Sequence, residues 1–240
     1  MIGWRARLGF IVPSINTVVE PEMAKMAPDG VSVHFARARS VKDTEEELIR
    51  MAEESPKAAR ELADAEVDVI AFACTGASFL KGPRYDSYVE GLITSAVNIP
   101  AVTTSTAVVQ ALRACGMKRV VVASPYEEWL NEREKIFLEA CGIEVLAMEG
   151  LGINDVHISD VHPERVYRLA RKVLRPDADG VFISCTDFRT AEILEVLEND
   201  TGKPVVSSNQ ATLWAMLRKL GLRVSIQGFG SLLRNIDGAR

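Results

Sequence analysis

A weak internal duplication constrains the fold of this chain more than any other feature of its sequence. Residues 67–75 (VDVIAFACT) resemble residues 178–186 (ADGVFISCT), 111 positions further along. The same spacing places residues 10–14 (FIVPS) on residues 121–125 (VVASP). Matches repeated at one spacing indicate two copies of one structural unit. We therefore expect two similar lobes related by a pseudo-twofold axis.

Short apolar runs alternate with longer amphipathic stretches along the whole chain. Runs that are apolar on both faces are typical of buried parallel strands, and their alternation with helices indicates βαβ units. The sequence therefore predicts an α/β fold with a parallel sheet in each lobe. The expected strands are 8–12, 31–35, 67–74, 101–103, 120–123, 144–146, 180–185, 205–206 and 224–226, and the main helical stretches are 44–65, 107–114, 132–140, 163–174 and 211–219.

Local signals agree with the predicted helices. Thr44 and Glu47 have the spacing of a capping box, and glycines stand where three of the helices should end. Glu20 and Glu22 flank a proline at an expected helix start, where acidic side chains favour the helix dipole, and we interpret them as capping residues. The three glycines are Gly116, Gly142 and Gly221.

Charge and composition exclude several classes of function. The net charge of −5 is spread along the chain, which gives no electrostatic reason to bind nucleic acid or an anionic membrane. No apolar run approaches the roughly 20 residues that span a bilayer, and the start of the chain lacks a signal-peptide core. We therefore expect a cytoplasmic protein with reduced thiols. The four cysteines form no C-x-x-C pair, so neither a zinc site nor a disulfide framework is expected.

Two of the cysteines occupy equivalent positions in the duplication. Cys74 and Cys185 each close a predicted strand and are each followed by threonine. Ligands bind at the carboxyl ends of parallel strands, where helix N-termini attract anions and are expected to lower a thiol pKa. A buried cysteine is usually only a small core residue, but a symmetric pair favours catalysis across one inter-lobe cleft. Cys115 and Cys141, in Ala-Cys-Gly at helix ends, are interpreted as structural.

Other polar residues fall on the same predicted edge. Ser14 and Asn16 follow the first strand, and Tyr126 follows its counterpart, where they could hold a carboxylate or simply form turns. Residues 103–106 and 207–209 either line the cleft or cap the next helix.

A segment rich in histidine and aspartate, residues 155–162, matches no standard ligand spacing, so no metal site is predicted there. Pro163 marks the helix start that follows it. The sequence also lacks the phosphate-binding glycine loops and the G-x-S-x-G motif of serine hydrolases.

These motifs resemble the aspartate/glutamate racemase superfamily, and within it the branch of maleate cis-trans isomerases and arylmalonate decarboxylases. Residues 11–22 resemble the opening motif of the isomerases, whereas residues 75–82, 103–107, 131–133 and 204–208 resemble the decarboxylases. The resemblance covers nearly the whole chain. It implies two flavodoxin-like lobes, an active site in the cleft between them, and no cofactor.

The first cysteine separates the two branches. Arylmalonate decarboxylases carry glycine there, so Cys74 favours an isomerase or racemase that uses both thiols. By resemblance, Cys74 would add to the double bond of maleate, and Cys185 would donate and accept the proton while the substrate rotates to fumarate. The substrate-binding set implied by sequence position and resemblance is Ser14, Asn16, Thr75, Gly76, Tyr126, Asn154 and Thr186.

Three alternatives to a maleate isomerase stay open from the sequence. They are an arylmalonate-type decarboxylase, an amino- or hydroxy-acid racemase, and a carboxylate-binding protein without chemistry. The expected lobes are residues 1–103 plus 208–240 and residues 104–207. We also expect a homodimer or higher homo-oligomer, with Trp129 and Leu130 as exposed apolar residues at an interface.

Overall fold

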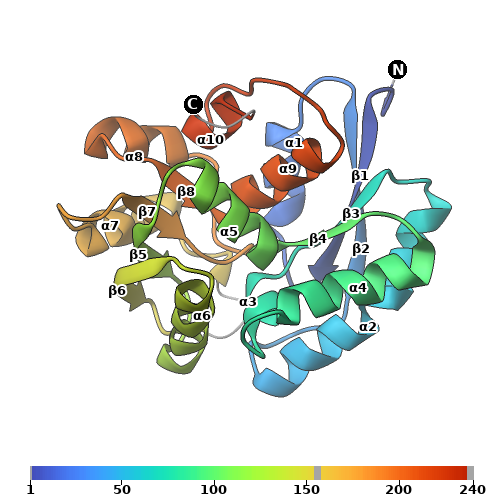
Figure 1. Ribbon diagram of the computed structural model, residues 1–240, viewed down its shortest axis with the longest axis horizontal. Coiled ribbons are helices and arrows are strands. Elements are labelled where there is room, and N and C mark those ends of the chain that lie inside the picture. Colours follow the sequence, from blue (N-terminus) through green and yellow to red (C-terminus); the bar gives the residue numbers. More distant parts are fainter. Residues whose placement is uncertain (1, 154–157, 237–240) are drawn as a thin grey trace.

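The computed structural model describes residues 2–153 and 158–236, which form two four-stranded parallel sheets (Figure 1). The strand order is β2-β1-β3-β4 in the first sheet and β6-β5-β7-β8 in the second, so both have the same topology. The predicted α/β fold with two similar lobes is confirmed. The strands are β1 (Ala6–Pro13), β2 (Val31–Ala38), β3 (Val69–Phe72), β4 (Ala101–Thr103), β5 (Arg119–Ser124), β6 (Glu144–Gly150), β7 (Gly180–Ile183) and β8 (Val205–Ser207).

Helices follow most of the strands and cover the sheets. The helices are α1 (Val19–Met26), α2 (Glu45–Asp64), α3 (Thr75–Phe79), α4 (Tyr85–Val97), α5 (Thr104–Ala114), α6 (Glu128–Ala140), α7 (Pro163–Val173), α8 (Leu194–Thr201), α9 (Ser208–Lys219) and α10 (Ser231–Arg234). Helices α2 and α4 pack together over the first sheet, and α6 and α7 pack on the second. Helix α9 follows β8 in the second sheet, yet it also packs on strands β3 and β4 of the first sheet and on helix α1. The predicted lobe boundaries remain a prediction.

The duplication is visible in the backbone of both sheets. Where β3 ends, the Ala73 N–H donates to the Ile11 carbonyl at 2.8 Å; where β7 ends, the Ser184 N–H donates to the Ala123 carbonyl at 2.9 Å. In both lobes the residue after each bond is the cysteine of the repeated motif. The two cysteines are therefore delivered by the same local geometry to the carboxyl ends of central strands.

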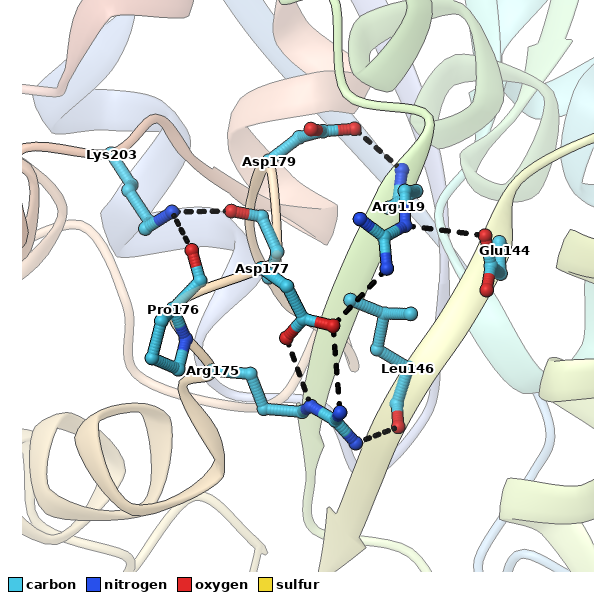
Figure 2. Close-up of polar contacts among 9 residues, drawn as sticks. Arg119, Glu144, Leu146, Arg175, Pro176, Asp177, Asp179 and Lys203 are labelled. Atoms are coloured by element: carbon cyan, nitrogen blue, oxygen red, sulfur yellow. Dashed lines mark hydrogen bonds and ion pairs between the residues drawn. The ribbon is translucent and has the colours of Figure 1, made fainter.

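Charged residues pair at the amino ends of the strands of the second sheet, at the end opposite the cysteine (Figure 2). The Asp179 carboxylate accepts from the Arg119 N–H at 2.7 Å, and the Arg119 guanidinium pairs with Asp177 at 3.1 Å and Glu144 at 3.3 Å. In the first sheet Asp68 accepts from the Arg7 N–H at 2.7 Å in the same way. These exposed pairs fix the amino ends of the strands and lie at the end of the sheet opposite the cysteines.

Several local predictions can be checked against the structure. Gly116, Gly142 and Gly221 follow helices α5, α6 and α9 with positive φ, as predicted for helix ends. Only half of the predicted capping box forms: Thr44 accepts from the Glu47 N–H at 3.4 Å, but the Glu47 carboxylate turns back to the N–H groups of residues 41 and 42.

Two sequence predictions were wrong. Residues 224–226 form no strand, because they run past α10 instead of beside another strand, and Ile226 donates to the Leu233 carbonyl at 2.9 Å. Leu130 is not exposed: it is 1 % accessible, and Trp129 is only partly exposed, because α6 turns this side toward α3. Within the described residues, no helix combines the length and the apolar character needed to cross a membrane.

Candidate active site

The carboxyl ends of strands from both sheets meet around a cavity of about 30 Å³. Both repeated cysteines line it, Cys74 at 6 % and Cys185 at 7 % accessibility. Neither thiol is sealed inside its own lobe. The cavity is lined by Pro13, Ile15, Asn16, Ser40, Asp43, Cys74, Thr75, Gly76, Tyr126, Ile158, Cys185, Thr186 and Asp187.

The two cysteines differ in backbone conformation although they end equivalent strands. Cys74 is extended, with φ −141°, and directly precedes helix α3. Cys185 has φ +90°, a region that residues with a side chain rarely adopt, and no helix follows until α8. Instead, the Asp187 N–H turns back to the Cys185 sulfur at 3.4 Å. Strained backbone of this kind is concentrated at functional sites.

The environment raises both thiol pKa values, contrary to the expectation that helix N-termini would lower them. Burial, followed by the negative charge of Asp43, raises the pKa of Cys74 to about 12 and outweighs the N–H of Ala77. Burial and then Asp43 and Asp187 raise the pKa of Cys185 well above its ordinary value, despite a hydrogen bond from Tyr126. The resting site therefore holds two protonated thiols.

Neutral hydrogen-bonding side chains cross from one lobe to the other at the cavity. Asn16, in the turn after β1, donates to the Thr186 hydroxyl at 3.3 Å. Thr186 in turn donates to the Ala73 carbonyl at 3.2 Å, beside Cys74. The Thr75 hydroxyl donates to Ser208 at the start of α9 at 3.0 Å. The predicted residues Asn16, Thr75 and Thr186 are thus brought together.

Tyr126 and Gly76 complete the wall between the thiols. Tyr126 is 3 % accessible, and burial together with the neighbouring acidic groups raises its pKa well above the ordinary value, so it is a neutral hydrogen-bond donor. Its carbonyl accepts from Asn131 of α6 at 3.3 Å, which holds the turn after β5. Gly76 lies close to Leu48 and Leu130, at 3.5 and 3.6 Å from where a Cβ would stand.

A second layer of polar residues holds the cysteine-bearing turns. The Ser208 hydroxyl accepts from the Cys185 N–H at 3.1 Å as well as from Thr75, so it links both motifs. Ser207 and Gln210 form a capping box at α9, and Thr103 caps α5 by accepting from Thr106. Residues 103 and 207 therefore act as caps and are not among the residues that line the cavity.

Glu22 is a lobe-bridging residue, and the capping interpretation was wrong for it. Its carboxylate, 7 % accessible, accepts from the backbone N–H groups of Thr190 at 2.6 Å and Ala191 at 2.7 Å and from Asn209 at 2.7 Å. These hydrogen bonds hold helix α1 against the segment that follows Cys185. Glu20 pairs instead with Arg37 on the surface at 2.5 Å. The sequence signal at both positions was the same.

A second buried glutamate stands behind Cys185. Glu134 of α6 is 1 % accessible, and burial raises its pKa to about 8. It accepts from the Ser184 hydroxyl at 2.5 Å, which fixes the residue before Cys185.

Two carboxylates are among the described residues that line the cavity. Asp43 lies in the loop between β2 and α2, and Asp187 follows Cys185 by two residues. Sequence reasoning passed over Asp43, although the loop follows the carboxyl end of β2 and so belongs to the edge that singled out the other residues. Asp187 bonds to the other lobe: it accepts from the Thr17 N–H, ahead of α1, at 2.9 Å.

The remaining predicted residues are placed elsewhere. Ser14 is not among the lining residues, and its hydroxyl exchanges hydrogen bonds with the backbone of Ser40. Asn154 lies outside the described residues. Cys115 and Cys141 are the C-caps of α5 and α6. His162 caps α7 ahead of Pro163, and the described residues contain no cluster of metal-ligating side chains.

The arylmalonate decarboxylase family model matches residues 8–233 of this chain. Maleate isomerase of Geobacillus stearothermophilus is 31 % identical, over 95 % of this chain and 96 % of that protein. The arylmalonate decarboxylase of Bordetella bronchiseptica is 29 % identical, over 89 % of this chain and 90 % of that protein.

Solved structures resemble this one over nearly its full length. The maleate isomerase of Pseudomonas putida S16, in a cysteine-to-alanine variant crystallised with maleate, has a TM-score of 0.92 and 31 % identity, covering 96 % of this chain and 98 % of that one. A cysteine-to-serine variant of Nocardia farcinica maleate cis-trans isomerase, with a covalently bound succinylcysteine intermediate, has a TM-score of 0.91 and 29 % identity, covering 95 % and 98 %.

Proposed function

The chain belongs to the arylmalonate decarboxylase family, and we propose that within it this protein is an isomerase that converts maleate to fumarate without a cofactor. The observation that carries the proposal is the pair of thiols, Cys74 and Cys185, at equivalent strand ends in the wall of one cavity. A double bond held between two thiols can be attacked on one carbon and protonated on the other.

The reaction that fits this pair begins with addition. The Cys74 sulfur, as thiolate, bonds to one alkene carbon, and the electron pair of the double bond moves to the other carbon, where the adjacent carboxylate delocalises it. The Cys185 thiol donates its proton to that carbon, which gives a succinyl thioether on Cys74. The central bond is now single and can rotate. Cys185 then recovers the proton, the carbon–sulfur bond breaks, and fumarate leaves with both cysteines restored.

Neutral donors are suited to hold the substrate carboxylates during this sequence. We assign this role to Asn16, Thr75, Gly76 (through its N–H), Tyr126 and Thr186, which line the cavity; Asn154 is retained from the resemblance alone. Ser14 is assigned a positioning role through Ser40. Because the resting thiols are protonated, Cys74 must lose a proton before it attacks, and activity should rise toward alkaline pH.

A decarboxylase of arylmalonates is the related alternative. An aryl group needs an apolar pocket, but the cavity wall here carries Asp43 and Asp187, and the family's decarboxylase resemblance implies glycine where this chain has Cys74. Both observations favour the isomerase. A decarboxylase would retain activity on a substituted malonate after Cys74→Gly and lose it after Cys185→Ser.

The direct test is incubation of the metal-stripped protein with maleate in deuterated buffer, followed by proton NMR. Formation of fumarate supports the proposal. In a parallel incubation with a candidate amino or hydroxy acid, deuterium entering that acid, with maleate untouched, would indicate a racemase instead. Binding of a dicarboxylate without turnover would indicate a non-catalytic binding protein.

Both cysteines must be reduced when each cycle begins, which favours a reducing compartment such as the cytoplasm. We further propose that the protein assembles as a homodimer or higher homo-oligomer, which sedimentation of the purified protein would test.

A further inference from the structure

The cavity is negatively charged before any substrate enters. Asp43 and Asp187 both line it and repel each other, and Glu127 adds to the negative potential at Asp43. No lysine, arginine or histidine is among the described residues of the lining. The Arg37 guanidinium lowers the pKa of Asp187 from a distance, but it is bound to Glu20 and to the backbone carbonyls of the β1 turn.

One carboxylate oxygen in this wall has no hydrogen-bond partner among the residues that the structure describes. Asp187 is 6 % accessible; its Oδ1 accepts from the Thr17 N–H, whereas its buried Oδ2 accepts no hydrogen bond within the described residues. The partly buried Asp43 lines the same wall and places a second carboxylate beside this oxygen. Because a buried acceptor without a donor is unfavourable, a ligand that supplies N–H or O–H groups at this place would be stabilised.

From these observations, and resting on the proposed isomerisation, we propose that the preferred substrate is a singly charged derivative of maleate. One end is a carboxylate held by the neutral donors, and the other end is an uncharged group with hydrogen-bond donors, such as a carboxamide, that faces Asp43 and Asp187. The addition, rotation and elimination are unchanged, so the cis monoamide maleamate gives the trans monoamide fumaramate.

Charge explains why the doubly ionised diacid is the poorer substrate. Its second carboxylate would lie against two ionised carboxylates at low effective dielectric, where like charges repel strongly. Burial raises the pKa of Asp43 to about 7 and that of Asp187 to about 6. At lower pH the same groups take up protons and can donate to a carboxylate, so discrimination against maleate is greatest above the pKa of Asp43.

The experiment compares kcat/KM for maleamate and maleate by proton NMR at a pH of about 9, where Asp43, Asp187 and maleate are ionised. The wild-type protein is expected to favour maleamate by about tenfold or more, and the preference should shrink as the pH falls below about 6. Asp43→Asn and Asp187→Asn should each shift the ratio of kcat/KM values toward maleate by about tenfold, and the ratio cancels any change in thiol reactivity that both substrates share. The control is Asp64→Asn, the same change of charge at an exposed position at the end of α2, which should leave the ratio unaltered.

The outcomes separate this inference from the proposed function. Turnover of maleate with no preference for maleamate overturns the inference and leaves the isomerase intact. Turnover of neither compound overturns both. If an asparagine variant fails to fold, the wild-type ratio and the relative inhibition by succinamate and succinate, the saturated analogues, still decide the question: stronger inhibition by succinate contradicts the inference.

Discussion

The two lobes present the same cysteine in different backbone states. In the first lobe, Cys74 has an ordinary extended conformation and leads into helix α3. In the second, Cys185 has φ +90°, and a non-helical turn held by Asp187 and Ser208 follows it. Duplication has therefore preserved the strand and the position of the sulfur, whereas the segment after the sulfur has diverged. A symmetric scaffold can thus hold two unequal groups, as a nucleophile and a proton carrier must be.

The largest expected difference between the two cysteines is chemical. Cys74→Ser and Cys185→Ser should each lower isomerisation by about 10²–10⁴-fold, because nucleophile and proton carrier are both required. They should differ in what accumulates. In Cys185→Ser the carbanion formed by addition of Cys74 takes its proton from water, and no thiolate is present to remove that proton again, so mass spectrometry should detect the mass of one maleic acid on Cys74. Cys74→Ser should show no adduct; an adduct on Cys185 in that variant would reverse the assigned roles.

Glu22 of the first lobe bonds to the segment after Cys185 in the second lobe, and its removal tests how the two lobes are held together. Removing its carboxylate by Glu22→Ala leaves the buried donors of Thr190, Ala191 and Asn209 without an acceptor. We expect a loss of about 2–4 kcal/mol in the free energy of unfolding, measured by urea denaturation. Glu20→Ala removes a surface ion pair two residues away and should cost less than about 1 kcal/mol. Equal effects would show that Glu22 does not bridge the lobes.

The repeated part of the chain is what the sequence could predict. The motif ending in Cys-Thr identified both strands and both cysteines, because strand ends follow from local apolar pattern, whereas the order of strands in each sheet was not predicted. Asn16, Thr75 and Thr186 followed from the same edge argument. These predictions depend only on where a strand stops.

The unrepeated parts could not be predicted in the same way. The pattern around Glu20 and Glu22 fits a helix start equally well at both positions, and only the packing of α1 against the second lobe distinguishes them. The raised thiol pKa values depend on burial and on Asp43, which approaches Cys74 through space and not along the chain. The φ of Cys185 likewise depends on the tertiary hydrogen bond from its N–H to Ser208.

Asp43 allows a test of how a nearby negative charge affects the pKa values of the two cysteines. Its negative charge raises the pKa of both thiols, so Asp43→Asn should lower both pKa values and increase the thiolate fraction at a given pH. We expect alkylation by iodoacetamide near pH 9 to be about threefold to tenfold faster, with mass spectrometry reporting each cysteine separately. Asp29→Asn, at an exposed position, is the matched control. A slower reaction in Asp43→Asn would mean that Asp43 activates the thiols and does not suppress them.

The smallest expected effect tests the difference in backbone conformation between Cys74 and Cys185. The informative result is which of the glycine and alanine variants is the more stable at each position. Alanine is disfavoured at φ +90°, whereas glycine adopts this conformation readily, so Cys185→Gly should be more stable to urea than Cys185→Ala by about 1 kcal/mol. At the extended position the order should reverse: Cys74→Gly should be less stable than Cys74→Ala by about 0.5–1 kcal/mol, because glycine loses more conformational entropy on folding. Each comparison removes the sulfur from both variants, so the loss of the thiol cancels. The same order at both positions would mean that the two cysteines share one backbone conformation, and the asymmetry between nucleophile and proton carrier would then have to arise from side chains alone.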